Sequence, residues 1–338
     1  MRNGKPSIAL LRTGGTIQQA RTSNGRAPTT IVLRQTVPEA RELAHIDEIE
    51  ICNVDSTEMT CAHRERLRDE VVRRIMSGRY EGIVITHGTD SMAMTGTYLS
   101  LTIPTPGIPI VLTGAQRPIG EPRSDASRNL LTAVEAALGP YQGCALAFDD
   151  ELLQANRTVK ISTNTFHAFH TPHVEPWARF GDRVTYQHNL RPRSIPVISE
   201  PTPYATGVDV YTVTTNDDPE RFLWRANDPG VSGIIIQGVG SGNVPMRIAD
   251  KIPSILEQGK PVVVISRCLD GFADATYTVG AHTLERGAIS GKDMTLDTAI
   301  TKLSIGIGLA HARHTTTQDR LAYVRAYITT PIADEISH

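Results

Sequence analysis

The chain has 338 residues, which is enough for one large domain or two of ordinary size. Hydrophobic residues make up 40% and charged residues 21%, a balance typical of a globular protein rather than a disordered or fibrous one. Lys plus Arg total 34 against 36 for Asp plus Glu, so the formal net charge is −2. This balance argues against a nucleic-acid partner, because a protein that binds nucleic acid normally carries a basic stripe.

The cysteines and the N-terminal stretch bear on location. Cys52, Cys61, Cys144 and Cys268 form no C-x-x-C pair, which favours reduced, mostly buried thiols and gives no sign of a zinc site. The apolar run before Arg12 is too short for a secretory signal. No stretch approaches the ~18 apolar residues of a membrane span. We therefore expect a cytoplasmic protein with no membrane partner.

Apolar runs alternate with helical patterns through the first half of the chain. The runs are continuous rather than alternating, which is typical of strands buried on both faces. Helical spacing with a closing glycine follows two of them, at 63–78 and 126–139. Such alternation predicts a parallel sheet flanked by helices. The predicted strands are Ser7–Leu11, Gly82–Thr86, Ile108–Gly114 and Cys144–Phe148.

The pattern breaks between Leu190 and Gly207, where four prolines occur without periodicity. Strand and helix patterns then resume, with a helix expected to kink near Pro253. We predict an α/β fold of two domains. The larger, catalytic N-terminal domain spans 1–190, a linker spans 191–207, and a smaller α/β C-terminal domain spans 208–338. The later strands are predicted at 208–213, 232–237 and 261–266, and the later helices at 246–259 and 296–310.

Two of the predicted strands end in glycine and threonine. Gly14 and Gly15 precede Thr16, and Gly88 precedes Thr89. Glycine permits backbone conformations in which main-chain N–H groups face a ligand, and ligands of parallel sheets bind at the carboxyl ends of the strands. Either motif alone fits an ordinary Gly-Thr turn equally well. Two such ends in one sheet favour a site.

These motifs carry a family resemblance. "TGGTI" (Thr13–Ile17) and "HGTDS" (His87–Ser91) resemble the two signature motifs of the bacterial-type L-asparaginase family. The likeness covers nearly the whole chain in the family's order and is specific for the family. It is less specific for the substrate, because relatives act on asparagine, glutamine and other amides. The further motifs are "VDSTEM" (54–59), "VLTGAQRP" (111–118), "SDASRNL" (124–130), "RTVKIST" (157–163) and "GVGSGN" (238–243).

The resemblance implies an amidohydrolase that works through a threonine acyl-enzyme. Thr16 is similar to the threonine that attacks the amide carbon. Thr89, Asp90 and Lys160 are similar to the family's second group, a hydroxyl bonded to a lysine that pairs with a carboxylate. The main-chain N–H groups of Thr89 and Ala115 are expected to bind the oxyanion. Without the resemblance, Lys160 fits a surface lysine on a strand.

The resemblance also implies binding residues. Ser56 and Thr57 match the loop that holds the carboxylate and amino group of the substrate, although a simple turn after the strand explains them as well. The backbone of Gly88 is expected beside the ligand. Asn243 matches a residue that reaches into a neighbouring subunit's site, which implies a homodimer or homotetramer. The expected partner is a small amide.

One stretch departs from the family pattern. Relatives carry a mobile flap with a tyrosine that closes over the nucleophile, yet Gln18–Pro28 contains no tyrosine. Arg26 falls at the corresponding position. Because a guanidinium can hold a carboxylate in bidentate fashion, we expect Arg26 to pair with an anionic substrate group or with Glu58. A larger or cyclic amide therefore remains an alternative substrate.

Other functions are less well supported by the sequence. His167, His170 and His173 are spaced three apart, but Pro172 breaks any helix between them, and we expect neither a metal nor a cofactor. The amidase subunit of a tRNA-dependent amidotransferase resembles asparaginase, but carries a domain ahead of the first motif. A two-domain amino-acid binding protein would be exported and would not use a threonine–lysine–aspartate set.

Overall fold

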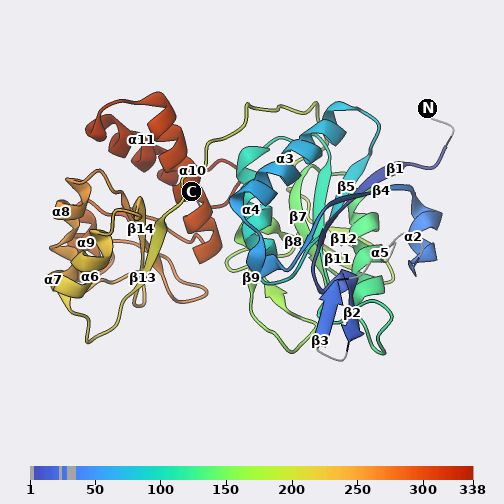
Figure 1. The fold of residues 1–338 in the computed structure, drawn as a ribbon, viewed down its shortest axis with the longest axis horizontal. Coiled ribbons are helices and arrows are strands. Elements are labelled where there is room, and N and C mark those ends of the chain that lie inside the picture. The colour runs from blue at the N-terminus through green and yellow to red at the C-terminus, as the bar shows by residue number, and fades with distance from the viewer. Residues whose placement is uncertain (1–3, 23–24, 29–35, 338) are drawn as a thin grey trace. The chain divides into compact units, whose positions relative to one another are not determined.

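The computed structural model describes residues 4–22, 25–28 and 36–337, and for 20–22 and 25–28 it describes the backbone alone. The chain divides into two compact units, Met1–Ser199 and Glu200–His338 (Figure 1). No helix in the described ranges has both the length and the apolar character needed to cross a membrane.

The larger unit is built mainly from strands that alternate with helices as far as β7 (Gly143–Phe148). Its helices are α2 (Pro38–Leu43), α3 (Cys61–Met76), α4 (Met92–Thr102) and α5 (Ala126–Ala137), with short 3-10 turns η1 (Thr16–Gln18), η2 (Ser56–Glu58) and η3 (Ala155–Arg157). Its strands are β1 (Ser7–Gly14), β2 (Gln19–Thr22), β3 (Gly25–Pro28), β4 (His45–Val54), β5 (Gly82–Thr86), β6 (Pro109–Thr113), β7 (Gly143–Phe148), β8 (Glu151–Gln154), β9 (Val159–Lys160), β10 (Phe169–His170), β11 (Ala178–Phe180) and β12 (Val184–Tyr186).

An eight-stranded sheet runs in the order β12-β11-β8-β7-β6-β5-β1-β4. The strands from β7 to β4 pair in parallel, so their carboxyl ends lie at one edge of the sheet. All five residues of β5 and of β6 are buried, as the continuous apolar runs predicted. The predicted parallel sheet is confirmed here. At the other end, β8, β11 and β12 pair in antiparallel fashion, which the sequence pattern did not reveal.

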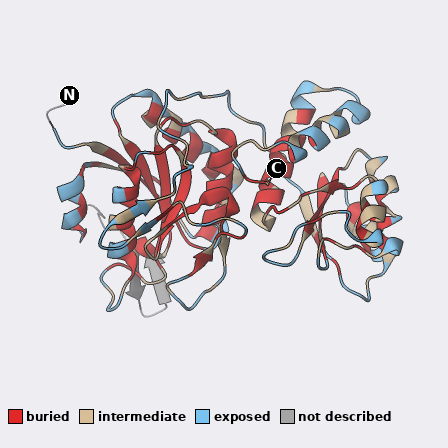
Figure 2. Cartoon of the chain, turned by 180° about the vertical axis from the view of Figure 1, so that it is seen from behind, coloured by how far each residue is buried: buried red, intermediate tan, exposed pale blue. Residues whose placement is uncertain are grey.

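Helices cover both faces of this sheet. Alternate strand residues such as Val84 and Val111 pack in one core cluster with Leu130 of α5. On the opposite face, Gly96 of α4 lies where an added Cβ would approach the side chain of Leu112. Figure 2 shows the central strands of the sheet, which include β5 and β6, and the inner sides of the helices as buried. The rigid sheet and its helices fix the loops that follow the strand ends.

The smaller unit contains a four-stranded parallel sheet in the order β13-β14-β15-β16. Pro253 is the second residue of α8 (Ile252–Leu256), where its missing N–H has no intrahelical partner to lose. The predicted kinked helix is therefore two short helices, α7 (Met246–Ala249) and α8. The strands are β13 (Val208–Thr212), β14 (Gly233–Gly238), β15 (Val262–Ser266) and β16 (Ile289–Ser290). The helices are α6 (Pro219–Ala226), α7 (Met246–Ala249), α8 (Ile252–Leu256), α9 (Thr278–Glu285), α10 (Leu296–Arg313) and α11 (Thr317–Thr329).

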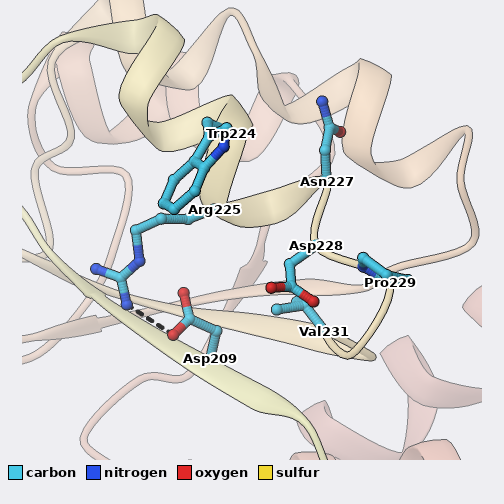
Figure 3. A pocket seen from close by; sticks show the side chains of 7 residues that line it. All are labelled: Asp209, Trp224, Arg225, Asn227, Asp228, Pro229 and Val231. Carbon is cyan, nitrogen blue, oxygen red and sulfur yellow. Dashed lines mark hydrogen bonds and ion pairs between the residues drawn. The ribbon is translucent and has the colours of Figure 1, made fainter.

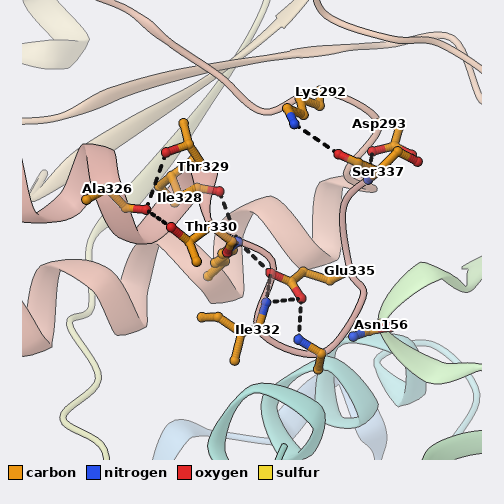
Figure 4. A network of polar contacts seen from close by, with 12 residues as sticks. Asn156, Lys292, Asp293, Ala326, Ile328, Thr329, Thr330, Ile332, Glu335 and Ser337 are labelled. Carbon is orange, nitrogen blue, oxygen red and sulfur yellow. Dashed lines mark hydrogen bonds and ion pairs between the residues drawn. The ribbon is translucent and has the colours of Figure 1, made fainter. Parts of the chain in front are cut away.

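A buried ion pair fastens the end of the chain to α10 and α11. Lys302 and Glu335 are both fully buried, and the Lys302 ammonium donates to the Glu335 carboxylate. The lysine also donates to the carbonyl oxygens of Ile328 and Thr330, at 2.9 and 2.8 Å. Glu335 accepts backbone N–H groups from the turn just before it, so both charges are well partnered (Figure 4).

Candidate active site

The first motif forms a glycine turn at the carboxyl end of β1. Gly14 has a φ of 102° and Gly15 a φ of 82°, values that favour glycine. A Cβ on Gly14 would lie 2.5 Å from the carbonyl oxygen of Val54, the last residue of β4. The turn is therefore packed tightly against the neighbouring strand end. Thr16, partly buried, is the first residue of η1 and follows directly from this turn.

The loop of the second motif packs against the first at glycine positions. A Cβ on Gly15 would lie 2.3 Å from the backbone nitrogen of Gly88, and a Cβ on Gly88 would lie 2.7 Å from the Ser56 hydroxyl oxygen. The loops after β1, β4 and β5 are thus in direct contact. The structure brings together the turn before Thr16, Ser56 and the loop of Thr89, as the order of strand ends predicts.

The lysine of the predicted group reaches Thr89 and Asp90 from a separate hairpin. Lys160 ends β9, which pairs in antiparallel fashion with β10. Its Nζ donates to Thr89 Oγ1 and to Asp90 Oδ1, each at 2.7 Å. Its side chain is only 17% exposed, so the surface-lysine interpretation does not describe it. A hydroxyl, an ammonium and a carboxylate in one chain of contacts can move or hold a proton.

Ser56 and Thr57 point to different partners. Ser56 is buried; its Oγ accepts from the backbone N–H of Asp90 at 3.2 Å, and its carbonyl accepts from Ser91 Oγ at 2.6 Å. Thr57 is exposed, and both its N–H and its hydroxyl donate to Asp55, at 2.9 and 2.7 Å. These bonds lower the pKa of the Asp55 carboxyl. Ser56 joins the second motif, whereas Thr57 closes a local turn.

A fourth loop follows β6 and contacts the second motif. A Cβ on Gly114 would lie 2.4 Å from the carbonyl oxygen of His87, which places the buried Ala115 next in this loop. The Asp125 carboxylate accepts the backbone N–H groups of Gln116 and Arg117, at 2.9 and 3.0 Å. The sequence motif at 124–130 contained this aspartate, but the sequence did not indicate its structural role.

His87 is a further buried group at the site that the sequence did not single out. Its ring is fully buried, and Nδ1 lies 2.7 Å from the carbonyl oxygen of Gly88. A carbonyl only accepts, so Nδ1 carries the proton of this bond. Burial lowers the pKa of His87 to about 4, and the nearby Arg64 charge acts in the same direction. The imidazole is therefore neutral at pH 7 and holds the Gly88 carbonyl, which belongs to the peptide preceding Thr89.

The two remaining predicted residues, Arg26 and Asn243, belong to the β2–β3 strand pair and to the smaller unit. The side chain of Arg26 lies outside the described residues; its backbone belongs to β3, which pairs with β2. Asn243 is in the smaller unit, where its backbone exchanges hydrogen bonds with Val239 at 2.9 and 2.8 Å. Its buried Oδ1 has no hydrogen-bond partner among the described residues.

The three histidines that are spaced three apart in the sequence, His167, His170 and His173, all lie within the described residues. His167 Nδ1 lies 3.2 Å from an oxygen of Asp149. Within the described ranges, no three His, Cys, Asp or Glu side chains come close enough together to hold a metal ion.

A pocket in the smaller unit is a weaker candidate for a catalytic site (Figure 3). Arg225, one of its lining residues, donates to the Asp209 carboxylate at 2.7 Å, and Asp228 accepts the N–H of Gly230, also at 2.7 Å. The charged groups are already paired with the protein itself. No nucleophile and base converge among these lining residues.

The strand-end loops and the threonine–lysine–aspartate contacts lie at the carboxyl edge of the parallel sheet of an α/β protein, where such sheets bind their ligands. The family described as "Asparaginase, N-terminal" matches residues 7–192, and the "Glutaminase/Asparaginase C-terminal domain" matches residues 207–318. The chain belongs to the asparaginase family.

Individual relatives cover most of the chain. The L-asparaginase of Thermococcus kodakarensis is 34% identical over 98% of this chain and 99% of its own. The solved structure of that thermostable L-asparaginase matches with a TM-score of 0.85, at 33% identity over 98% of this chain and 99% of its own. L-asparaginase 1 of Escherichia coli (strain K12) is 30% identical, over 88% of this chain and 91% of its own. A glutamyl-tRNA(Gln) amidotransferase component of Pyrococcus abyssi is also 30% identical, over 99% of this chain and 77% of its own.

Proposed function

We propose that this protein is an L-asparaginase, which hydrolyses the side-chain amide of L-asparagine to L-aspartate and ammonia. The observation that carries the proposal is the contact of Lys160 Nζ with both Thr89 Oγ1 and Asp90 Oδ1, beside the glycine turn that precedes Thr16. The L-asparaginases among the relatives support the choice of substrate.

In the proposed reaction, the Thr16 oxygen attacks the amide carbon. The oxygen of the amide becomes an oxyanion, which main-chain N–H groups of Thr89 and Ala115 stabilise. Ammonia leaves as the carbonyl re-forms, and a Thr16 ester remains. Water then attacks this ester, which releases aspartate and regenerates the hydroxyl group of Thr16.

Thr89, Lys160 and Asp90 handle protons in this scheme. The Thr89 oxygen accepts from Lys160, so its own hydrogen can be directed toward another oxygen. When Lys160 is neutral, it can accept the hydrogen of Thr89, and Thr89 can take the proton of Thr16 or of water. The proton held by Lys160 then returns through Thr89 to the amide nitrogen, which leaves as ammonia, and in the second step to the Thr16 oxygen. Asp90 keeps the lysine in place through its 2.7 Å contact.

The α-carboxylate and amino group of the substrate are assigned to the loop of Ser56 and Thr57 with the backbone of Gly88. Ser56 is the better supported of the two side chains, because its oxygen already contacts the N–H of Asp90 in the second motif. The Thr57 hydroxyl is bonded to Asp55 and would have to exchange that bond to contact a ligand.

We also propose that the protein works as a homodimer or homotetramer. Asn243, which matches a residue that reaches into a neighbouring subunit's site, follows β14 in the smaller unit. Exposed apolar side chains follow β14 and β15 in the same unit, as an interface would require. They are Val239, Met246, Leu269, Phe272 and Tyr277.

A cytoplasmic location is proposed from the cysteines. Cys52, Cys61, Cys144 and Cys268 are all free thiols. Unpaired thiols suit a reducing compartment.

Ammonia release from a panel of amides tests the function. L-asparagine should give the highest kcat/KM, followed by L-glutamine, with acetylated and cyclic amides as further substrates in the panel. Thr16→Ala should remain folded and lose nearly all turnover, because losing a nucleophile usually lowers kcat by orders of magnitude. No ammonia from L-asparagine would contradict the substrate. A Thr16→Ala protein with more than about a tenth of the wild-type kcat would contradict the nucleophile.

A larger or cyclic amide is the second candidate substrate, and the absence of tyrosine between Gln18 and Pro28 favours it. If Arg26 binds an anionic group of the substrate, Arg26→Ala should raise KM about ten- to a hundredfold, as expected for one lost charged hydrogen bond. Arg26→Tyr should then shift preference toward plain asparagine. Unchanged kinetics of Arg26→Ala on the best substrate would exclude this role.

A further inference from the structure

Gln18 is a buried polar side chain beside the nucleophile that the proposed chemistry does not use. It is the last residue of η1, only 1% exposed, and β2 begins directly after it. Burying an amide is unfavourable unless it is hydrogen-bonded. Its contacts therefore indicate what the side chain does there.

The Gln18 oxygen connects the ends of two strands. Gln18 Oε1 accepts the backbone N–H of Gly14 at 3.2 Å and the hydroxyl of Thr86 at 3.4 Å. Gly14 is the last residue of β1, and Thr86 is the last residue of β5. Thr13 reinforces the connection, because its hydroxyl donates to the Thr86 carbonyl at 2.9 Å.

These bonds restrict the backbone of the glycine turn in the first motif. Gly14 and Gly15 have no side chains and adopt left-handed conformations, so the turn before Thr16 has wide conformational freedom in isolation. A buried amide that binds the Gly14 N–H removes part of this freedom. It does so from a residue two positions after Thr16, so both flanks of the threonine are tied to the end of β5.

We propose that Gln18 is a positioning residue, which holds the turn of Thr16 in register with the loop of Thr89 through Gly14 and Thr86. The role in turnover rests on the proposed function, whereas the structural connection does not. Gln18 acts through the backbone and contacts no reacting atom. Small displacements of a reacting group lower rates strongly, so the side chain should affect kcat more than KM.

A pair of matched variants separates this role from general stability. Gln18→Leu removes the acceptor oxygen at similar volume. Gln142→Leu is the control, because Gln142 is 8% exposed, its Oε1 also accepts a backbone N–H, from Gly107 at 3.0 Å, and it lies outside the proposed site. Both variants lose a buried hydrogen-bonded amide. Only Gln18→Leu should lower kcat, by about ten- to a hundredfold, with KM changed less than about threefold.

A second variant tests the acceptor oxygen itself. Gln18→Glu keeps an oxygen at the same reach, and both the ionised and the protonated carboxyl can accept from the Gly14 N–H. We expect Gln18→Glu to retain a higher kcat than Gln18→Leu. The Gln18→Glu variant should be less stable than the wild type, because it buries a carboxyl group. Should Gln18→Leu fail to fold, Gln18→Glu and Thr86→Val, which removes the other donor, provide the kinetic comparison.

Hydrogen exchange at the Gly14 amide gives a readout that does not depend on turnover. Exchange should be faster in Gln18→Leu than in the wild type, and unchanged in Gln142→Leu. If the wild type hydrolyses no amide, the proposed function is wrong. The exchange rate of the Gly14 amide still tests whether Gln18 holds the turn. Normal kcat with unchanged Gly14 exchange in folded Gln18→Leu would overturn the proposal, as would equal losses of kcat in the two leucine variants.

Discussion

The backbones of Gly15 and Gly88 pack directly against each other. A Cβ on Gly15 would lie 2.3 Å from the nitrogen and 2.4 Å from the α-carbon of Gly88. Real Cβ atoms do not approach a backbone this closely, and a backbone cannot move aside as a flexible side chain can. The first signature motif therefore needs glycine at this contact. The second needs glycine at position 88 because a Cβ there would lie 2.7 Å from the Cβ and the Oγ of Ser56.

Gly15→Ala should lose stability and most of its kcat, because the methyl group forces the loops of Thr16 and Thr89 apart. Gly78→Ala is the matched control: Gly78 also has a positive φ, of 60°, but a Cβ there meets nothing within 4 Å. The control should lose only about 1–2 kcal/mol from the left-handed conformation. Urea unfolding and kcat measure both variants, and similar losses in the two would contradict the contact.

The sequence predicted this part of the molecule well, for a physical reason. Continuous apolar runs mark doubly buried parallel strands, and parallel strands bring their carboxyl ends to one edge. The positions of Thr16, Thr89 and Ser56 follow from that rule. The antiparallel strands β8, β11 and β12 could not be recognised in the same way, because they are short, and because β11 and β12 include exposed residues.

Thr89 and Lys160 should behave as one unit. Their 2.7 Å contact means that removing either side chain removes the same interaction. Lys160→Met and Thr89→Val should each lower kcat strongly, and the double variant should be little worse than the more damaging single variant.

The comparison is made from kcat in the two single variants and the double variant. Thr57→Val provides a control, because its hydroxyl is bonded to Asp55 rather than to the lysine group. Combined with Lys160→Met, it should give losses that multiply. Multiplying losses for Lys160→Met with Thr89→Val would show that these two residues work separately.

His87 should make the protein less stable as the pH falls. Its pKa in the folded chain is about 4, below the ordinary value of 6.5, so between these values the unfolded chain binds more protons. The free energy of unfolding should therefore be fully retained above pH 6.5 and fall by about 3 kcal/mol as the pH approaches 4.

Replacement by a side chain that does not titrate isolates this effect. The stability difference between the wild type and His87→Gln, measured by urea unfolding at pH 7, 5.5 and 4.5, should shift in favour of the variant as the pH falls. His45→Gln is the control, since His45 is exposed. A difference between wild type and His87→Gln that stays constant with pH would contradict the assignment.

The roles of His87 and Gln18 could not be predicted from the sequence. Neither residue type indicates burial, yet His87 is 0% and Gln18 is 1% exposed. Their partners, the Gly88 carbonyl and the Gly14 N–H, are backbone groups that no side-chain pattern reveals. Asp125 belongs to the same class, because it binds backbone N–H groups of a loop eight and nine residues away.

Lys302→Met should destabilise the smaller unit by about 3–5 kcal/mol, because it leaves the fully buried Glu335 carboxylate without its counter-charge. The double variant Lys302→Met/Glu335→Gln should recover part of this loss. It removes the unpaired charge, and the amide oxygen can still accept the N–H groups of Ile332 and Ala333.

The matched control is an ion pair of the same unit on the surface. Lys251 contacts Glu220 at 2.7 Å, but the two side chains are 32% and 73% exposed. Lys251→Met should therefore cost less than about 1 kcal/mol. Urea unfolding followed by circular dichroism gives the free energies, and carboxypeptidase digestion reports release of the C-terminal residues, which should occur only in Lys302→Met. If both methionine variants lost the same stability and kept their C-termini protected, the ion pair would not be what fastens the end of the chain.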